Sequence, residues 1–260
     1  MFFKTINFSK YSSIKVGQPT SVLMIEQNDT IPKDRYIIGG ANNLLLSPAP
    51  PALMMLSKDF AYIKEYDNLL EIGASMPSGR IVSYAKKHNL SGFEFMSKLP
   101  GQLGGLVAMN AGVKKYEIFD ILHSVCIDGK WMEVSQLEYG YRYAKLGGIV
   151  TGARFEISLG YNYELEKMLS ALRANQPSTP SAGSAFKNPP NDSAGRLIDA
   201  VGLKGYRKGD MAWSEVHANF LVNLGNGKFE DAIYLLELAK KRVFEEFGIT
   251  LQEEIKILVV

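Results

Sequence analysis

Residues 180–189 read PSAGSAFKNP, which places a hydroxyl, an ammonium and an amide between two prolines. Each proline fixes its own φ and favours an extended residue before it, while Gly183 permits a backbone angle that other residues avoid. The pattern predicts a polar loop that holds Ser184 in place. A surface turn rich in small residues is the alternative.

The composition is that of an ordinary globular chain. Its 260 residues are 46% hydrophobic and 22% charged, enough for one large domain or roughly two to three small ones. Lys and Arg number 29 against 27 Asp and Glu, for a net charge of +2, and no run of Lys or Arg exceeds three residues. This balance argues against nucleic acid and a membrane surface as partners, so an anionic ligand must be bound by local groups.

The single cysteine, Cys126, excludes an internal disulfide framework and a cysteine zinc site. It fits a reducing compartment. No apolar segment reaches membrane-spanning length, and the first residues contain no sustained apolar stretch. We therefore expect a cytoplasmic protein without a metal site.

The first segment, residues 1–55, ends in an apolar strand, a small-residue turn and a second apolar strand over residues 36–46. Two glycines, an alanine and two asparagines in the turn let the backbone approach a ligand closely, and their N–H groups can form an anion-binding nest. A hairpin turn without a ligand is the alternative. The turn has neither the Rossmann glycine spacing nor the P-loop ending.

The second segment begins near residue 56 and contains a strand at 69–74, followed by a helix that starts near Pro77 and Ser78. Residues 99–112, LPGQLGGLVAMNAG, then bring four glycines together. Such a stretch implies backbone packed closely against another group. A glycine-rich helix contact in the core is one explanation, but Asn110 among apolar residues favours contact with a bound cofactor.

The chain next becomes rich in β-structure. Asp128-Gly129 predicts a hairpin between two apolar runs, and residues 149–158 predict a further strand. Between them lies Arg142 in a tyrosine-rich stretch. The arginine either stacks on rings at the surface or faces a site, where it would be well shaped to hold a carboxylate.

The third segment starts with a helix over residues 164–175, in which Leu165, Met168, Leu169 and Leu172 share one side. Ser193 can cap a short helix that ends at Gly202. A long amphipathic helix spans residues 229–247, and a terminal strand that includes Glu254 spans 251–260. The buried stripe of the long helix is predicted to be Phe229, Ala232, Ile233, Leu236, Ala239, Val243 and Phe247.

Taken together and in this order, the motifs resemble the UDP-N-acetylenolpyruvoylglucosamine reductases, the flavoenzymes that make UDP-N-acetylmuramate for bacterial peptidoglycan. The resemblance covers nearly the whole chain. Its most specific parts are the Pro-Gly-x-x-Gly-Gly pattern that ends in residues 109–112, and the run of residues 182–189. The stretches at 39–46, 141–142, 203–205 and 217–223 and the Glu254 ending complete it.

The resemblance implies an α+β protein with an FAD-binding fold of the vanillyl-alcohol-oxidase (PCMH) type. Residues 1–55 and 56–160 would form its two FAD-binding subdomains, and residues 161–260 a C-terminal α+β domain that binds substrate. FAD would be bound tightly without a covalent bond, and NADPH would donate the hydride. The implied cofactor-binding residues are Gly39, Gly40, Ala41, Asn42, Asn43, Leu44, Pro100, Gly101, Gly104, Gly105, Asn110, Ala111 and Gly112.

The family's chemistry implies roles for three residues. NADPH reduces the flavin, which then passes hydride to the enolpyruvyl double bond of the UDP-sugar and leaves an enolate-like anion. By position, Arg142 and Glu254 would stabilise or polarise the enolpyruvyl carboxylate, and Ser184 would donate the proton. Glu254 suits this role only if it is protonated or bridged by hydrogen bonds, because a second bare anion would oppose the developing charge.

Substrate recognition follows from the same resemblance. Asn188 and Lys204 match positions near the uridine diphosphate, where an amide and a positive charge suit phosphate oxygens. A structural role is the alternative for both. His217 and Asn219 are expected to support the site through hydrogen bonds rather than touch the ligand. The substrate is a small molecule, and we expect a monomer.

The chain departs from the family pattern at several places. Only 42 positions separate Arg142 from Ser184, too few for the insertion that brings a tyrosine over the substrate in one branch of the family. Relatives often have a glutamate at Gln252, a glycine at Lys98 and a serine at Ala144. Of these, Ala144 bears most on the site, because a lost hydroxyl could alter the position of Arg142.

Three other functions fit parts of the pattern. A different flavin oxidase of the same fold would be reoxidised by air alone. A non-catalytic flavin- or sugar-nucleotide-binding protein would keep the glycine-rich turns but need neither Ser184 nor Glu254. A hydrolase based on Ser184 is the weakest alternative, since no Gly-x-Ser-x-Gly motif surrounds that serine.

Overall fold

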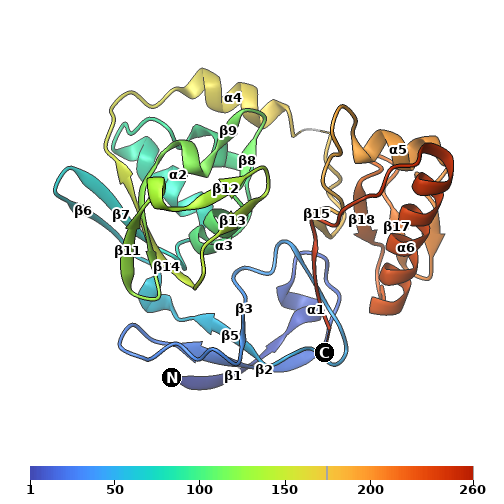
Figure 1. The fold of residues 1–260 in the computed structure, drawn as a ribbon, viewed down its shortest axis with the longest axis horizontal. Coiled ribbons are helices and arrows are strands. Elements are labelled where there is room, and N and C mark those ends of the chain that lie inside the picture. Colours follow the sequence, from blue (N-terminus) through green and yellow to red (C-terminus); the bar gives the residue numbers. More distant parts are fainter. Residues whose placement is uncertain (174, 260) are drawn as a thin grey trace. The chain divides into compact units, whose positions relative to one another are not determined.

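The computed structural model describes residues 1–173 and 175–259, and its contacts divide the chain into two compact units. Ala174 and Val260, which the predicted helix at 164–175 and the terminal strand include, lie outside the described residues. Figure 1 shows the elements of both units. Unit 1 comprises Met1–Lys4, Val22–Gly40 and Leu53–Ala174; unit 2 comprises Thr5–Ser21, Ala41–Ala52 and Asn175–Val260.

The core of unit 1 lies against a five-stranded antiparallel sheet of order β11-β10-β14-β7-β6. Apolar residues of its strands pack with those of α2 and α3 in one buried cluster, so burial of apolar surface holds this unit together. The sheet strands and helices are β6 (Ile63–Tyr66), β7 (Leu69–Gly73), α2 (Ser78–Lys87), α3 (Leu103–Ala108), β10 (Leu122–Ile127), β11 (Lys130–Glu133), β14 (Val150–Glu156) and α4 (Tyr163–Ala171).

Shorter elements complete the second half of unit 1. Two antiparallel pairs, β8 with β9 and β12 with β13, carry the residues on which the site depends. The bounds are η1 (Lys58–Phe60), η2 (Glu94–Lys98), β8 (Gly112–Val113), β9 (Tyr116–Glu117), η3 (Ile118–Asp120), η4 (Val134–Gln136), β12 (Glu138–Gly140) and β13 (Tyr143–Lys145).

Several local predictions for unit 1 are confirmed. Asp128 and Gly129 have φ of 48° and 79° and join β10 to β11, as a two-residue hairpin requires. The helix predicted near Pro77 is α2, with Pro77 at its N-cap. The helix predicted over residues 164–175 is α4, which ends at Ala171. In α4 only Leu169 is buried, whereas Met168 and Leu172 are 52% and 44% exposed.

A second sheet, of order β1-β2-β5-β3, contains β1 (Phe2–Asn7), β2 (Pro19–Ile25), β5 (Leu53–Leu56) and β3 (Tyr36–Ile37). Strand β3 pairs with β5 in parallel, whereas β4 (Leu44–Leu46) pairs in parallel with β19 (Lys256–Leu258). The two strands that flank residues 39–43 therefore do not pair with each other. The hairpin alternative for that turn is wrong.

Unit 2 is built on an antiparallel sheet of order β15-β18-β17-β16, together with α5 and α6. Trp213 and Phe186 are fully buried, with ring centroids 6.0 Å apart, and belong to its core cluster. The elements are α1 (Phe8–Tyr11), β15 (Ser181–Ser184), α5 (Ala194–Ala200), β16 (Arg207–Lys208), β17 (Met211–Trp213), β18 (Phe220–Asn223) and α6 (Phe229–Phe247).

The helix predictions for unit 2 are confirmed. Ser193 caps α5 through the Arg196 N–H, and α6 spans the predicted residues and ends at Gly248, whose φ is 67°. The predicted stripe of α6 needs one correction, because Phe247 is 38% exposed. Leu235, outside that stripe, is buried instead.

The stretch at 180–189 is less of a loop than its sequence indicates. Residues Ser181–Ser184 form strand β15, which pairs with β18. The register shifts between Ser181 and Ser184, and Gly183 lies in that interval with a φ of 81°. A strand therefore holds Ser184, opposite Phe220. The terminal strand is also shorter than predicted, since β19 starts at Lys256 and Glu254 precedes it.

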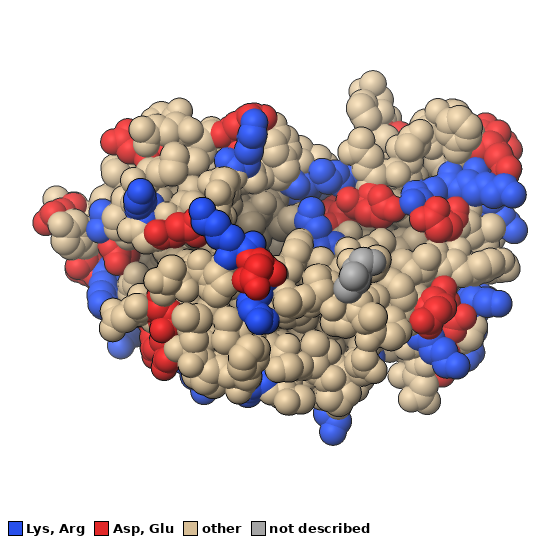
Figure 2. Space-filling view, turned by 60° about the horizontal axis from the view of Figure 1, so that its bottom comes forward, with Lys and Arg blue, Asp and Glu red and all other residues tan. Residues whose placement is uncertain are grey.

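None of the helices in the described ranges combines the length and the apolar composition needed to cross a bilayer. On the face in Figure 2, Lys and Arg lie intermixed with Asp and Glu. The nearly equal numbers of the two kinds are consistent with that pattern.

Candidate functional site

Arg142 lies in the two-residue turn that joins β12 to β13. Gly140 pairs with Tyr143 across this hairpin, which leaves Tyr141 and Arg142 at its tip, and Arg142 has a φ of 60°. A Cβ at position 140 would lie 2.6 Å from the ring of Tyr143, so a larger residue there would have to displace that ring. The left-handed backbone conformation of Arg142, which a large side chain rarely adopts, fixes the direction in which its side chain leaves the turn.

The guanidinium of Arg142 is held by the backbone that follows α3. Nη1 donates to the Asn110 carbonyl at 3.3 Å, and Nη2 donates to the Gly112 carbonyl at 3.0 Å. The side chain is 17% exposed, and Oε1 of Glu117 lies 3.6 Å from Nη1. Stacking on Tyr141, with 4.9 Å from guanidinium carbon to ring centroid, accounts for only one of these contacts. The arginine is thus oriented by its own unit.

Asn110 is fully buried and its amide is used inside unit 1. Its Nδ2 donates to Oε2 of Glu117 at 2.7 Å and to the Gly140 carbonyl at 3.1 Å, and its Oδ1 accepts from the Phe119 N–H. The side chain thus satisfies its hydrogen bonds without a ligand. A cofactor contact by the backbone of residues 110–112 stays a prediction.

The glycines around α3 serve different purposes. A Cβ on Gly104 would lie 3.1 Å from the Cβ of Ala74, so this residue makes the core contact that was the alternative. Its N–H also donates to the Ala74 carbonyl. A Cβ on Gly105, by contrast, would meet nothing within 4 Å, and Gly101 has a φ of 123°. Gly105 therefore has space beside it for a ligand, and Gly101 has a backbone angle that favours glycine.

The turn at residues 39–44 belongs to both units, with Gly39 and Gly40 in unit 1 and the rest in unit 2. Within unit 2, Nδ2 of Asn42 donates to Oγ of Ser13 at 2.6 Å, and Nδ2 of Asn43 donates to the Glu254 carbonyl at 2.9 Å. Both asparagine amides therefore have protein partners. Their predicted cofactor contacts remain untested.

In unit 2, a backbone hydrogen bond between Glu254 and Ala185 brings Glu254 close to Ser184 along the chain. The Glu254 N–H donates to the Ala185 carbonyl at 2.8 Å, and Ala185 directly follows Ser184. The neighbouring residues Phe186 and Glu253 form a bridge. The fold thus places two of the three predicted catalytic residues together, although 70 positions separate them in the sequence. The third, Arg142, belongs to unit 1.

As expected, Asn219 supports this part of the chain through hydrogen bonds to the backbone of Phe186. Its Oδ1 accepts from the Phe186 N–H at 3.0 Å, and its Nδ2 donates to the Phe186 carbonyl at 2.8 Å. His217 accepts from the Asn219 N–H through Nδ1 at 3.3 Å. Burial, and then repulsion by Lys204, lower the pKa of His217, which favours the neutral ring that can accept this bond.

We expect Asn219→Ala to destabilise the protein by about 1–3 kcal/mol, because the buried N–H and carbonyl of Phe186 both lose their partner. Urea unfolding would measure the change. The matched control is Asn226→Ala, since Asn226 is exposed, and it should leave the midpoint nearly unchanged. Equal midpoints for the two variants would contradict the supporting role of Asn219.

The two predicted substrate-binding residues have partners within unit 2. Oδ1 of Asn188 accepts from the Ala194 N–H at 3.1 Å, at the start of α5. Nζ of Lys204 lies 3.3 Å from Asp199 and the lysine is 40% exposed. Both contacts fit the structural alternative. The hydrogen bond to Oδ1 of Asn188 also fixes the orientation of its amide, including Nδ2. Phosphate binding by these residues stays a prediction.

Sequence reasoning missed two residues beside Arg142. Glu117 contacts both Arg142 and Asn110, and only its place shortly after the glycine-rich stretch could have indicated it. Arg173 follows α4; burial, and then repulsion by Arg142, lower its pKa. No motif or spacing links residues 142 and 173, so only the fold could bring the two cations near each other.

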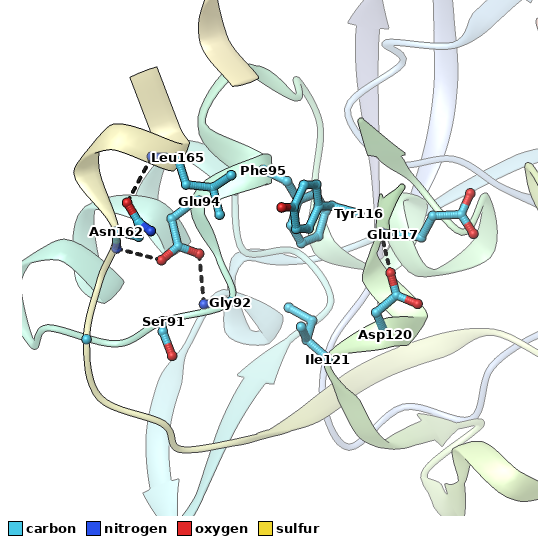
Figure 3. Close-up of a pocket in the computed structure, with 11 residues that line it drawn as sticks. Ser91, Gly92, Glu94, Phe95, Tyr116, Glu117, Asp120, Ile121, Asn162 and Leu165 are labelled. Carbon is cyan, nitrogen blue, oxygen red and sulfur yellow. Dashed lines mark hydrogen bonds between the residues drawn. The ribbon is translucent and has the colours of Figure 1, made fainter. Parts of the chain in front are cut away.

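A cavity of about 360 Å³ lies in unit 1 between η2, β9, η3 and the start of α4, and Glu117 is among the residues that line it (Figure 3). Its carboxylates already accept backbone bonds. Glu94 accepts from the N–H groups of Gly92 and Asn162, and Asp120 accepts from that of Glu117. None of the predicted site residues lines it. Across residues 1–173 and 175–259, no group of His, Cys, Asp and Glu could hold a metal ion.

Comparison with known proteins gives consistent results. The family model described as UDP-N-acetylenolpyruvoylglucosamine reductase, C-terminal domain, matches residues 175–258. The reductase of that name from Helicobacter hepaticus is 52% identical over 97% of this chain and 98% of its own length. The one from Helicobacter pylori strain 26695 is 46% identical over 99% of this chain and 100% of its own.

A solved structure gives the same result for the fold. The crystal structure of UDP-N-acetylenolpyruvylglucosamine reductase from Thermus caldophilus superposes with a TM-score of 0.86 and 33% identity. It covers 99% of this chain and 100% of the crystallised one. The similarity therefore includes both units and the mixed α/β architecture.

Proposed function

This chain belongs to the UDP-N-acetylenolpyruvoylglucosamine reductase family, and from that premise we propose how it works. It reduces UDP-N-acetylglucosamine enolpyruvate to UDP-N-acetylmuramate for peptidoglycan synthesis, with hydride from NADPH. Arg142, Ser184 and Glu254 are its catalytic residues. The observation that supports this assignment best is the hydrogen bond from the Glu254 N–H to the carbonyl of Ala185, the residue directly after Ser184.

The cofactor in this proposal is FAD, bound without a covalent bond by a PCMH-type fold. The open space beside Gly105 supports the predicted contacts, because it would let a large planar group approach the backbone there. FAD, when bound, carries hydride from NADPH to the enolpyruvyl double bond. The division at residues 55 and 160 into two FAD-binding subdomains and a substrate domain stays part of the proposal.

The protein's own contribution is charge stabilisation and one proton. Arg142 offsets the negative charge that develops on the enolpyruvyl group, and it does so without giving up its own proton. The contacts to the Asn110 and Gly112 carbonyls fix the guanidinium before substrate binds, so little reorganisation is needed during the reaction. Ser184 donates the proton through Oγ, at the end of β15, which keeps that residue in place.

Glu254 needs a partner to act beside a developing anion. Its backbone is fixed on both sides, because its N–H donates to Ala185 and its carbonyl accepts from Asn43. Its side chain is half-buried. We propose that a hydrogen bond or a proton on this carboxyl lets it polarise the substrate.

Substrate binding completes the proposal. Lys204 and Asn188 meet the uridine diphosphate, and Lys204 exchanges Asp199 for a phosphate oxygen when the nucleotide arrives. We propose a monomer that works in the cytoplasm. The short interval between Arg142 and Ser184 assigns the chain to the branch without the tyrosine-bearing insertion.

The visible spectrum under anaerobic conditions tests the function. NADPH should bleach the oxidised flavin, and UDP-N-acetylglucosamine enolpyruvate should then restore it. If no flavin is present and none can be reconstituted, the assignment of the glycine-rich turns is wrong. If reduced flavin persists after the sugar is added, the named reaction is wrong although the fold assignment stands.

A further inference from the structure

Arg142 has to be held in place if it is to stabilise charge. It lies at the tip of a hairpin turn, and an arginine side chain carries about 2 kcal/mol of rotamer entropy. Donors that stabilise a transition state are most effective when they are oriented in advance. The two carbonyls that accept from Arg142 orient the group but do not offset its charge.

We infer that Glu117 is a positioning residue that fixes Arg142 and ties it to the Asn110 turn. One oxygen of its carboxylate, Oε1, lies 3.6 Å from Nη1 of Arg142, and the other, Oε2, accepts from Nδ2 of Asn110 at 2.7 Å. One carboxylate therefore bridges the arginine and the residue whose carbonyl also binds it. The inference rests on the proposed role of Arg142.

The backbone fixes Glu117 itself. It lies in β9 directly opposite Gly112, and its N–H donates to Oδ2 of Asp120 at 2.8 Å. A Cβ on Gly112 would lie 2.9 Å from both Cα and Cγ of Glu117, so glycine permits this close approach. The carbonyl of Gly112, on the neighbouring strand β8, accepts from Arg142. The β8–β9 pair thus fixes the position of the Glu117 carboxylate relative to the Arg142 guanidinium.

Arg173 gives a second reason for a carboxylate here. Its pKa is lowered first by burial and then by repulsion from Arg142, so two guanidinium groups repel each other in this part of unit 1. The charge of Glu117 offsets that repulsion at Arg142. An uncharged side chain could keep the bond to Asn110 but could not do this.

The test separates the charge of Glu117 from its shape. In Glu117→Gln, an oxygen can still accept from Asn110, but the ion pair with Arg142 is lost. We expect flavin reoxidation by the enolpyruvyl sugar to slow by about 10- to 100-fold, as for a misplaced catalytic group, with flavin reduction by NADPH unchanged. Glu138→Gln removes an exposed carboxylate of unit 1 that pairs with Lys145, and it should leave both rates near those of the unaltered enzyme.

A double-mutant cycle distinguishes positioning from a general structural effect. If Glu117 acts through Arg142, Glu117→Gln should cause little further slowing once Arg142→Ala is present. Fully additive effects would overturn the inference. A normal reoxidation rate in Glu117→Gln, together with a slow one in Arg142→Ala, would overturn it too and leave the proposed function standing.

A second measurement does not depend on activity. The Arg142 Nε–H signal in a ¹⁵N NMR spectrum should report a rigid side chain in the unaltered protein and in Glu138→Gln, and a mobile one in Glu117→Gln. If the sugar never reoxidises the flavin, the proposed function fails while this signal still tests the positioning. An equally rigid Arg142 in Glu117→Gln would contradict the role of Glu117.

Discussion

Ser184→Ala should slow reoxidation of the reduced flavin by the enolpyruvyl sugar by about 10²- to 10⁴-fold, the range that a positioned proton donor contributes. Reduction of the flavin by NADPH should keep its rate, because that step requires no proton from this serine. Stopped-flow absorbance of the flavin measures the two steps separately. The change removes a single oxygen, and the strand pairing of β15 with β18 is made by backbone atoms, so the fold should persist.

Ser181→Ala is the matched control, because Ser181 begins the same strand and loses the same oxygen. Both half-reactions should proceed normally in this variant. Equal rates for Ser184→Ala and Ser181→Ala would exclude Ser184 as the donor. If Ser184→Ala instead slows both steps, the serine affects flavin binding or the fold rather than protonation.

Arg142→Ala should slow the same step by about 10²- to 10³-fold, the usual cost of removing a donor that stabilises a developing anion. Arg142→Lys should recover only part of that loss. A lysine keeps the charge but cannot present the planar fork that bonds to the carbonyls of Asn110 and Gly112 together. The rate of reoxidation at saturating sugar measures this effect apart from substrate affinity.

Arg154 provides a control for loss of an arginine from unit 1. It donates to Glu71 through Nε at 2.9 Å and stacks on Trp131, with 3.9 Å from guanidinium carbon to ring centroid. Arg154→Lys should lower the urea midpoint and leave both flavin steps unchanged. If it slows reoxidation as much as Arg142→Lys does, the effect at Arg142 comes from the stability of unit 1.

Local sequence signals predicted the elements that depend on neighbouring residues. The Asp128-Gly129 turn and the bounds of α6 with Gly248 follow from backbone preferences and apolar spacing within a few residues. The predicted burial of Phe247 was wrong, because apolar spacing shows which residues share a face but not how far the rest of the fold covers it.

The order of motifs along the chain was enough to identify the family, and with it the candidates Arg142, Ser184 and Glu254. The chemistry of these side chains follows from their residue type, so a sequence pattern can identify them. That Arg142 acts on the same substrate as Ser184 and Glu254 stays a prediction. The experiments on Ser184 and Arg142 address it through their shared effect on one step.

Residue order alone was sufficient for the local elements and for the candidate residues of the site, because turn, cap and motif residues act over short distances. The pairing of strands across long intervals, such as β4 with β19, became known only from the folded chain. The same holds for the place of Glu254 beside Ala185 and for the bridge that Glu117 makes between Asn110 and Arg142. These contacts depend on how distant strands come together, and no local spacing encodes that geometry.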